Sequence, residues 1–147
     1  MISKGGIMSN VKSKTRDYLD TVKTVSLATC MDDKPSCRIM EIQKVDDDLK
    51  IWFVAHKSSP KMEQIDKNNS ACIVSFNNET FKDVRLFGTI EVFEDMETKK
   101  YIWKEELAPY FQDGINDPEL TVLKFIPEGL EYRDMKSGGL LPEVENV

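Results

Sequence analysis

The sequence is poor in the residues from which many active sites are built. It has one histidine, His56, and three cysteines, Cys30, Cys37 and Cys72, with no C-x-x-C pair. Zinc sites and Ser-His-Asp triads need more histidine and cysteine in closer clusters, so we expect neither of them and no bound metal. An odd number of scattered cysteines is typical of reduced thiols in a cytoplasmic protein rather than of a disulfide framework.

Long apolar runs and an excess of positive charge are missing as well. No stretch approaches the ~20 apolar residues of a membrane-crossing helix. The first residues lack the apolar segment of a secretion signal, so we expect a cytoplasmic protein with no membrane contact. The 26 acidic and 20 basic residues give a formal net charge of −6. A nucleic-acid partner is not expected, because such binding needs a basic surface.

The pattern that is present predicts one domain over residues 1–147, in which about 1–8 and 136–147 form loose tails. Apolar periodicity and turn residues predict helices over 9–22, from 59 to 69 and over 95–107, and strands over 24–30, 36–45, 49–55, 71–76, 84–93 and 121–132. Tight turns between consecutive strands favour antiparallel pairing. We therefore expect a mainly β fold, a small six-stranded barrel with helices at its margins.

The most informative segment runs from the third strand into the next helix, Phe53-Val54-Ala55-His56-Lys57-Ser58-Ser59-Pro60-Lys61. Free N–H groups at a helix start, together with hydroxyls and lysines, suit a phosphate group. Arg38 on the neighbouring strand could reach the same phosphate. The alternative is structural: Ser59 caps the helix ahead of Pro60, the lysines are solvated, and Arg38 is exposed or ion-paired.

Two long segments carry a family resemblance. They are "TVSLATCMDDKPSCRIMEIQKVDDDLKIWFVAHKSSPKMEQIDKNNSACIVSF" and "PYFQDGINDPELTVLKFIPEGLEYRD". Together they resemble the general-stress-protein branch of the pyridoxamine 5′-phosphate oxidase-like superfamily, from about Val22 to Asp134. The resemblance implies a six-stranded antiparallel Greek-key split barrel. It also implies a homodimer with FMN bound at the subunit interface.

The resemblance further implies a set of cofactor-binding residues on the second and third strands, the helix that follows and the distal part of the chain. They are Arg38, Ile39, Met40, Ala55, His56, Lys57, Ser59, Lys61, Trp103 and Phe111. In this set Arg38 and the backbone of the next two residues lie by the ring and the ribityl phosphate. The hydroxyl and the two lysines hold the phosphate, and one of the two distal aromatics covers the ring from the second subunit.

The chain departs from the family pattern at two of these positions. Ala55 stands where the family often has threonine, and Ser59-Pro60-Lys61 stands where it often has Ser-Arg-Lys. One hydroxyl and one cation are therefore missing from the implied site. The segment after Asp134 is short and rich in glycine, so the portion that binds substrate in true pyridoxamine phosphate oxidases has no counterpart, and we do not expect the vitamin B6 reaction.

The expected function is an FMN-dependent oxidoreductase that transfers hydride or electrons through the flavin to an unidentified small molecule. One alternative is the same fold with another cofactor, a deazaflavin or a haem, and haem ligation would then rest on His56. A second alternative is a non-catalytic, stress-related flavin-binding protein.

Overall fold

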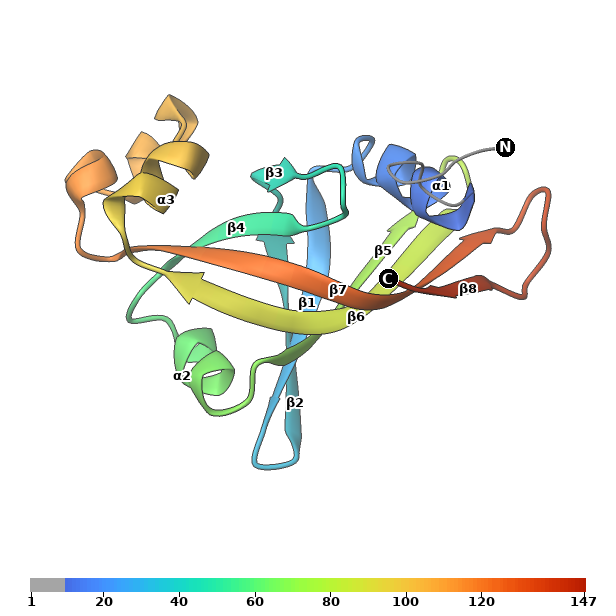
Figure 1. Cartoon of the computed structure of the whole chain (residues 1–147), viewed down its shortest axis with the longest axis horizontal. Coiled ribbons are helices and arrows are strands. Elements are labelled where there is room, and N and C mark those ends of the chain that lie inside the picture. The colour runs from blue at the N-terminus through green and yellow to red at the C-terminus, as the bar shows by residue number, and fades with distance from the viewer. Residues whose placement is uncertain (1–9) are drawn as a thin grey trace.

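A computed structural model describes residues 10–147, which form a curled antiparallel sheet with helices at its ends. The strands are β1 (Thr24–Met31), β2 (Lys34–Glu41), β3 (Lys44–Val45), β4 (Ile51–His56), β5 (Ser70–Asn77), β6 (Lys82–Phe93), β7 (Leu120–Asp134) and β8 (Glu143–Asn146). The helices are α1 (Asn10–Leu19), α2 (Pro60–Lys67) and α3 (Met96–Ile102), with 3-10 segments η1 (Glu105–Tyr110) and η2 (Gly114–Asn116). Figure 1 shows α1 at one end of the sheet and α3 with the 3-10 segments at the other.

The sheet order is β2-β1-β5-β6-β7-β4-β3, with β8 paired to β7, and every pair is antiparallel. The mainly β, antiparallel prediction is therefore confirmed. All six expected strands are present, one of them divided into β2 and β3, and β8 is an additional short strand. Inward-facing apolar side chains of the sheet form one main core, in which Leu27, Phe53, Ile73, Leu86 and Phe125 are fully buried.

The expected second strand over 36–45 is divided in two. The Ile42 N–H donates to the Lys23 carbonyl, whereas the Gln43 N–H donates to the Trp52 carbonyl. The chain thus changes partner between these two residues, from the β1 side to β4. Of the two parts of the expected strand, only β2, which ends at Glu41, pairs with β1. No glycine or proline marks the break between Ile42 and Gln43, which is why the sequence suggests one strand.

The turn between β1 and β2 is tighter than expected. Asp32 and Asp33 have φ values of 53° and 61°. Two consecutive residues with positive φ are typical of a type I′ hairpin turn. Lys34 and Pro35, expected in the turn, belong to β2, where the proline is tolerated because β2 is an edge strand.

Helix boundaries follow the sequence signals closely for α2 and less closely for α3. Helix α2 begins at Pro60 after Ser59 and ends before Asn68, as expected. The predicted helix over 95–107 is wrong in its second half. The extended backbone of Trp103 (φ −58°, ψ 137°) ends α3 at Ile102, and η1 follows as a separate segment.

The C-terminal residues are more ordered than predicted. β8 pairs with β7, and Lys12 and Lys14 of α1 form ion pairs with Glu145 and Glu143. The expectation of a loose tail is therefore wrong for residues 143–146. The expected loose segment 1–8 lies outside the described residues.

A glycine inside a strand, such as Gly88 of β6, predicts a bulge or a close approach of backbones. In the structure Gly88 lies against the backbone of β7. A Cβ at this position would lie 2.0 Å from the carbonyl oxygen of Ile126. The pairing of β6 with β7 shifts register between Phe87 and Gly88, which marks the expected bulge.

None of the helices within residues 10–147 is long and apolar enough to cross a membrane.

Candidate functional site

A pocket of about 300 Å³ lies where β2, β4, the start of α2 and η1 meet. Seven of the sequence-predicted site residues line it: Ile39, Met40, Ala55, His56, Ser59, Lys61 and Phe111. Five lining residues were not predicted: Glu41, Gln43, Val54, Leu107 and Tyr110. Three of the five, Glu41, Val54 and Tyr110, are next to predicted residues in the sequence, so their sequence neighbours were a usable signal.

The apolar wall of the pocket is held in place by His56 at the end of β4. Its Nε2–H donates to the Tyr110 carbonyl oxygen at 2.8 Å. Its ring stacks on Phe111, with centroids 4.5 Å apart and an interplanar angle of 18°. Phe111 and Leu107 in turn pack with Leu120 at the start of β7 in a small separate core. These contacts fasten η1 against the sheet and make it one side of the pocket.

Lys61 and Ser59 provide the polar end of the pocket. The Lys61 Nζ donates to the Ser59 hydroxyl at 3.2 Å. The Ser59 side chain makes no capping hydrogen bond to α2. Ser59 is thus the N-cap residue by position, as the structural alternative expects, but its hydroxyl takes no part in capping. Burial, and after it the nearby positive charge of Arg38, lower the pKa of Lys61 below its ordinary value.

Arg38 does not line the pocket but supports it from the sheet. Its guanidinium donates to the Leu27 carbonyl at 3.1 Å, to the Thr29 hydroxyl at 2.9 Å and to the Gln64 side-chain oxygen at 2.8 Å. All three acceptors are uncharged. Burial lowers the pKa of Arg38 as well.

These two cations lie close enough to interact, and neither is neutralised by a carboxylate. Among residues 10–147, the ion pairs within 4.0 Å involve neither Arg38 nor Lys61. Uncompensated positive charge at the edge of a hollow attracts an anion. This end of the pocket is therefore suited to a phosphate or carboxylate group.

Two other predicted site residues lie outside the pocket. Lys57 is exposed and pairs with Glu94 at 2.9 Å, as a solvated surface lysine would. The Trp103 Nε1–H donates to Glu105 at 2.9 Å, and its ring meets Phe111 edge-on at 6.5 Å. Coverage of a bound ring by a distal aromatic of a second subunit stays a prediction.

The pocket opens onto an apolar outer face of the sheet, formed by β1, β2, β5 and β6. Ile39, which lines the pocket, is 67% exposed, and Val74, Phe76 and Phe87 are 40%, 48% and 38% exposed. Ile39 and Val74 both pair with Ser26 of β1, so they lie on the same face. Arg85, which pairs with Val74, is also exposed on this face and forms an ion pair with Glu131. Several exposed apolar side chains gathered on one face favour an interaction surface.

Comparison with known proteins places the chain among relatives of one family. Residues 10–145 match the family described as pyridoxamine 5′-phosphate oxidase like. General stress protein 26 of Bacillus subtilis (strain 168) is 34% identical over 136 residues, which cover 90% of this chain and 94% of that protein. The structure of a Clostridium acetobutylicum protein related to general stress protein 26 matches with a TM-score of 0.82 and 25% identity, covering 96% of this chain and 97% of that one. The predicted split-barrel architecture is thereby confirmed.

Two more distant structures share the fold and differ in the group they are described as binding. An FMN-binding protein from Nostoc punctiforme matches with a TM-score of 0.69 and 14% identity, covering 97% of this chain and 99% of that one. A heme-binding protein from Mycobacterium smegmatis matches with a TM-score of 0.73 and 12% identity, covering 95% of this chain and 59% of that one. At these identities the likeness concerns the fold alone.

Proposed function

The chain belongs to the pyridoxamine 5′-phosphate oxidase-like family, and from this premise we propose that it is an FMN-binding flavoprotein. The observation that carries the proposal is the pocket between β2, β4, α2 and η1. Half of its lining residues are apolar, Lys61 lines its polar end, and Arg38 lies close to Lys61 without lining the pocket. FMN has the matching shape, because it joins a flat ring to a phosphate.

The residues of the pocket fit this cofactor in type and position. Lys61 and Ser59 would hold the phosphate, and Arg38 on β2 would add positive charge next to Lys61. Met40, Val54 and Ala55 would contact the ring. Bound flavin would supply hydride or electron transfer to a small-molecule substrate, while the protein binds and orients both. The hydroxyl missing at Ala55 and the cation missing at Pro60 leave Lys61 as the principal phosphate ligand.

We further propose that a second copy of the chain completes the site. A volume of about 300 Å³ is at the lower limit of the range for pockets that enclose an organic ligand. Ile39 both lines the pocket and belongs to the exposed face of the sheet. A subunit packed on that face would therefore also close the pocket. This arrangement supports a homodimer with the cofactor at the interface.

Haem is the alternative that the heme-binding relative of the same fold suggests. His56 is the one histidine of the sequence, and its Nε2 is engaged with the Tyr110 carbonyl. Haem ligation through Nε2 would have to break this hydrogen bond, one of the contacts that hold η1 on the sheet. The geometry therefore favours the flavin.

The first experiment is the absorption spectrum of the purified protein, with mass spectrometry of any molecule released on denaturation. The proposal expects a two-band flavin spectrum and released FMN. A haem spectrum, or a colourless protein that fails to bind added FMN, would contradict it. If flavin is bound but no reductant ever reduces it, the oxidoreductase activity is wrong and the non-catalytic alternative holds.

The phosphate assignment predicts that Lys61→Ala weakens FMN far more than riboflavin, which has no phosphate. A charge-assisted hydrogen bond contributes about 1.5–3 kcal/mol, so we expect the Kd for FMN to rise roughly 10- to 100-fold. Titration of both ligands by flavin fluorescence measures the ratio. Lys67→Ala, in the last turn of the same helix, is the matched control and should change neither affinity. Equal losses for FMN and riboflavin would disprove the assignment.

A further inference from the structure

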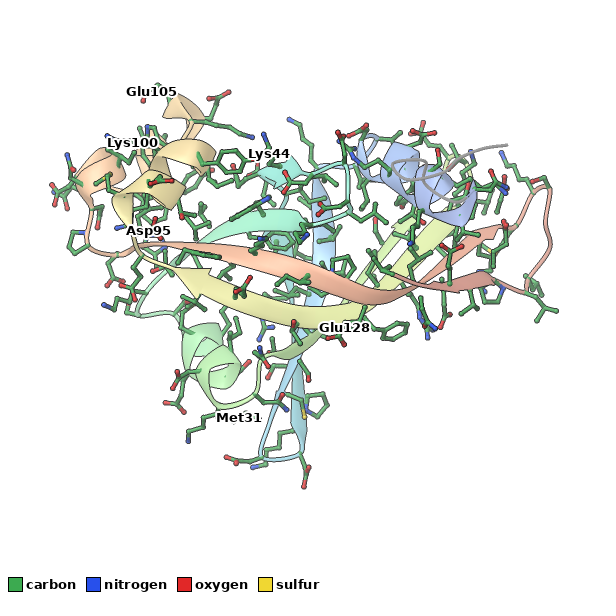
Figure 2. The ribbon with its side chains drawn as sticks, viewed as in Figure 1. Met31, Lys44, Asp95, Lys100, Glu105 and Glu128 are labelled. Carbon is green, nitrogen blue, oxygen red and sulfur yellow. The ribbon has the colours of Figure 1, made fainter. Side chains whose placement is uncertain are left out.

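Gln64, in the second turn of α2, connects that helix to both strands of the β1–β2 hairpin. Its side-chain oxygen accepts from the Thr29 hydroxyl at 2.6 Å and from the Arg38 guanidinium at 2.8 Å. Its Nε2–H donates to the Ser36 hydroxyl at 3.4 Å. Figure 2 shows α2 beside this hairpin, in which Met31 is labelled. These hydrogen bonds fix α2 relative to β2, the two elements between which the polar end of the pocket lies.

The side chains of Arg38, Thr29 and Gln64 form a closed set of hydrogen bonds. Arg38 donates to Thr29 at 2.9 Å as well as to Gln64, and Thr29 donates to Gln64, so each side chain is bonded to the other two. Thr29 is buried. A buried hydrogen-bond network in which every member has its partners holds those members in one arrangement. The guanidinium of Arg38 is therefore positioned from α2 as well as from its own hairpin.

Lys61 lies next to this network on the same helix. It precedes Gln64 by three residues, and side chains at that spacing are neighbours on a helix surface. The charge of Arg38 reaches Lys61, because Arg38 contributes, after burial, to the lowered pKa of Lys61. The acceptor that Gln64 offers to Arg38 is uncharged. A carboxylate in its place would pair with the guanidinium and cancel the positive charge next to Lys61.

We propose that Gln64 is a positioning residue that holds Arg38 beside Lys61 and, because it is neutral, leaves both positive charges available to an anionic ligand. This inference rests on the proposed FMN site and deepens it. Gln64 is not among the side chains that line the pocket, so it acts on the ligand through Arg38. The preference of the pocket for a ligand with a phosphate over the same ligand without one therefore depends on a residue outside the pocket.

The test compares Gln64→Glu with Lys67→Gln, which lowers the net charge by the same amount in the last turn of α2. Glutamate has nearly the shape of glutamine and keeps the oxygen that Thr29 and Arg38 contact. In Gln64→Glu we expect the Kd for FMN to rise about tenfold and the Kd for riboflavin, which has no phosphate, to change less than about twofold. Unchanged riboflavin binding shows that the variant is folded. Lys67→Gln should leave both affinities as they are, as measured by flavin fluorescence titration.

A double-mutant cycle shows whether Gln64 acts through Arg38. In an Arg38→Gln background the guanidinium is absent, so Gln64→Glu should have much less effect on the Kd for FMN than it has in the wild type. An effect of the same size in both backgrounds would overturn the inference, because Gln64 would then act on the ligand directly. A rise in Kd that is equal for FMN and riboflavin would overturn it as well, because the role of Gln64 would then be structural.

A second measurement needs no flavin. NMR titration of the Lys61 side chain in the unliganded protein should give a higher pKa in Gln64→Glu than in the wild type, because a carboxylate beside Arg38 offsets the repulsion between the two cations. Glu41, His56 and Tyr110, the other titratable side chains that line the pocket, are the same in both proteins. An unchanged pKa would overturn the inference. If the wild type binds no flavin, the proposed function fails, and this titration still decides whether Gln64 sets the charge beside Lys61.

Discussion

At the scale of single residues, the site is defined by polar groups that the chain itself leaves without charged partners. The pKa of Lys61 is lowered by burial and by Arg38, so its positive charge does not stabilise the unliganded fold. The Arg38 guanidinium donates its hydrogen bonds to uncharged acceptors of β1 and α2. Such an arrangement is common at binding sites, where function and stability oppose each other. We therefore expect Lys61→Ala to melt no lower than the wild type.

Gly88 is a residue at which the fold tolerates no side chain. The Cβ of Gly88→Ala would lie 2.0 Å from the Ile126 carbonyl oxygen, a backbone atom that cannot move without disturbing β7. We expect a loss of about 3 kcal/mol in the free energy of unfolding, measured by urea denaturation. Gly129→Ala is the matched control, since the nearest atoms to its Cβ would be 3.9 Å away. Equal stability of the two variants would show that β6 and β7 are not packed as described.

At the scale of elements, the wall formed by η1 and η2 depends on a few polar contacts. Asp117 is 8% exposed, and its carboxylate accepts from the backbone N–H groups of Glu119 at 2.9 Å and Asp113 at 3.2 Å. Together with the hydrogen bond and ring stacking of His56, these contacts hold the loop after η1 on the sheet. The stability of this wall should therefore depend on pH.

The backbone hydrogen bond from Glu119, and next the one from Asp113, lower the pKa of Asp117 below its ordinary value. A carboxyl with a lower pKa in the folded state stabilises the fold above its unfolded pKa, near 3.9, and loses that contribution as the pH falls through the folded value. Asp117→Asn should therefore melt below the wild type at pH 6. The difference should shrink below about pH 4, as measured by thermal unfolding between pH 3 and 6. A difference independent of pH would contradict this role.

At the scale of the whole molecule, the apolar outer face and the open pocket point to one assembly. The proposed homodimer would cover Ile39, Val74, Phe76 and Phe87 and close the pocket at the same time. Binding of FMN and association of subunits should then be linked, because each stabilises the arrangement that the other needs.

Val74→Asp places a carboxylate opposite Arg85 on this face. Because burying a charged pair in an interface costs more than burying a valine, the variant should convert a dimer into a monomer, as measured by sedimentation. The variant should also bind FMN more weakly, because the pocket stays open. Met96→Asp on α3 is the matched control: methionine 96 is 38% exposed against 40% for Val74 and lies away from the face. A wild-type monomer, or a dimeric Val74→Asp, would disprove the proposed interface.

The sequence by itself determined most of the strands, the start of α2 and the close approach at Gly88. These features follow from local rules: alternation along a strand, proline in the first turn of a helix, and glycine where backbones meet. The same local signals identified Ser59 and Lys61 as the polar end of the site. The family resemblance added Ile39, Met40 and Phe111, which the pocket brings together.

Only the tertiary structure decided the rest of the site. Gln43 reaches the pocket because the chain changes its pairing partner from the β1 side to β4 between Ile42 and Gln43. The alternation of apolar residues along a strand does not indicate which strand pairs with it. Lys57 is removed from the site by its ion pair with Glu94, a residue 37 positions away along the chain. Pairings between distant segments depend on how the whole sheet closes, which is why neither could be predicted from neighbouring residues.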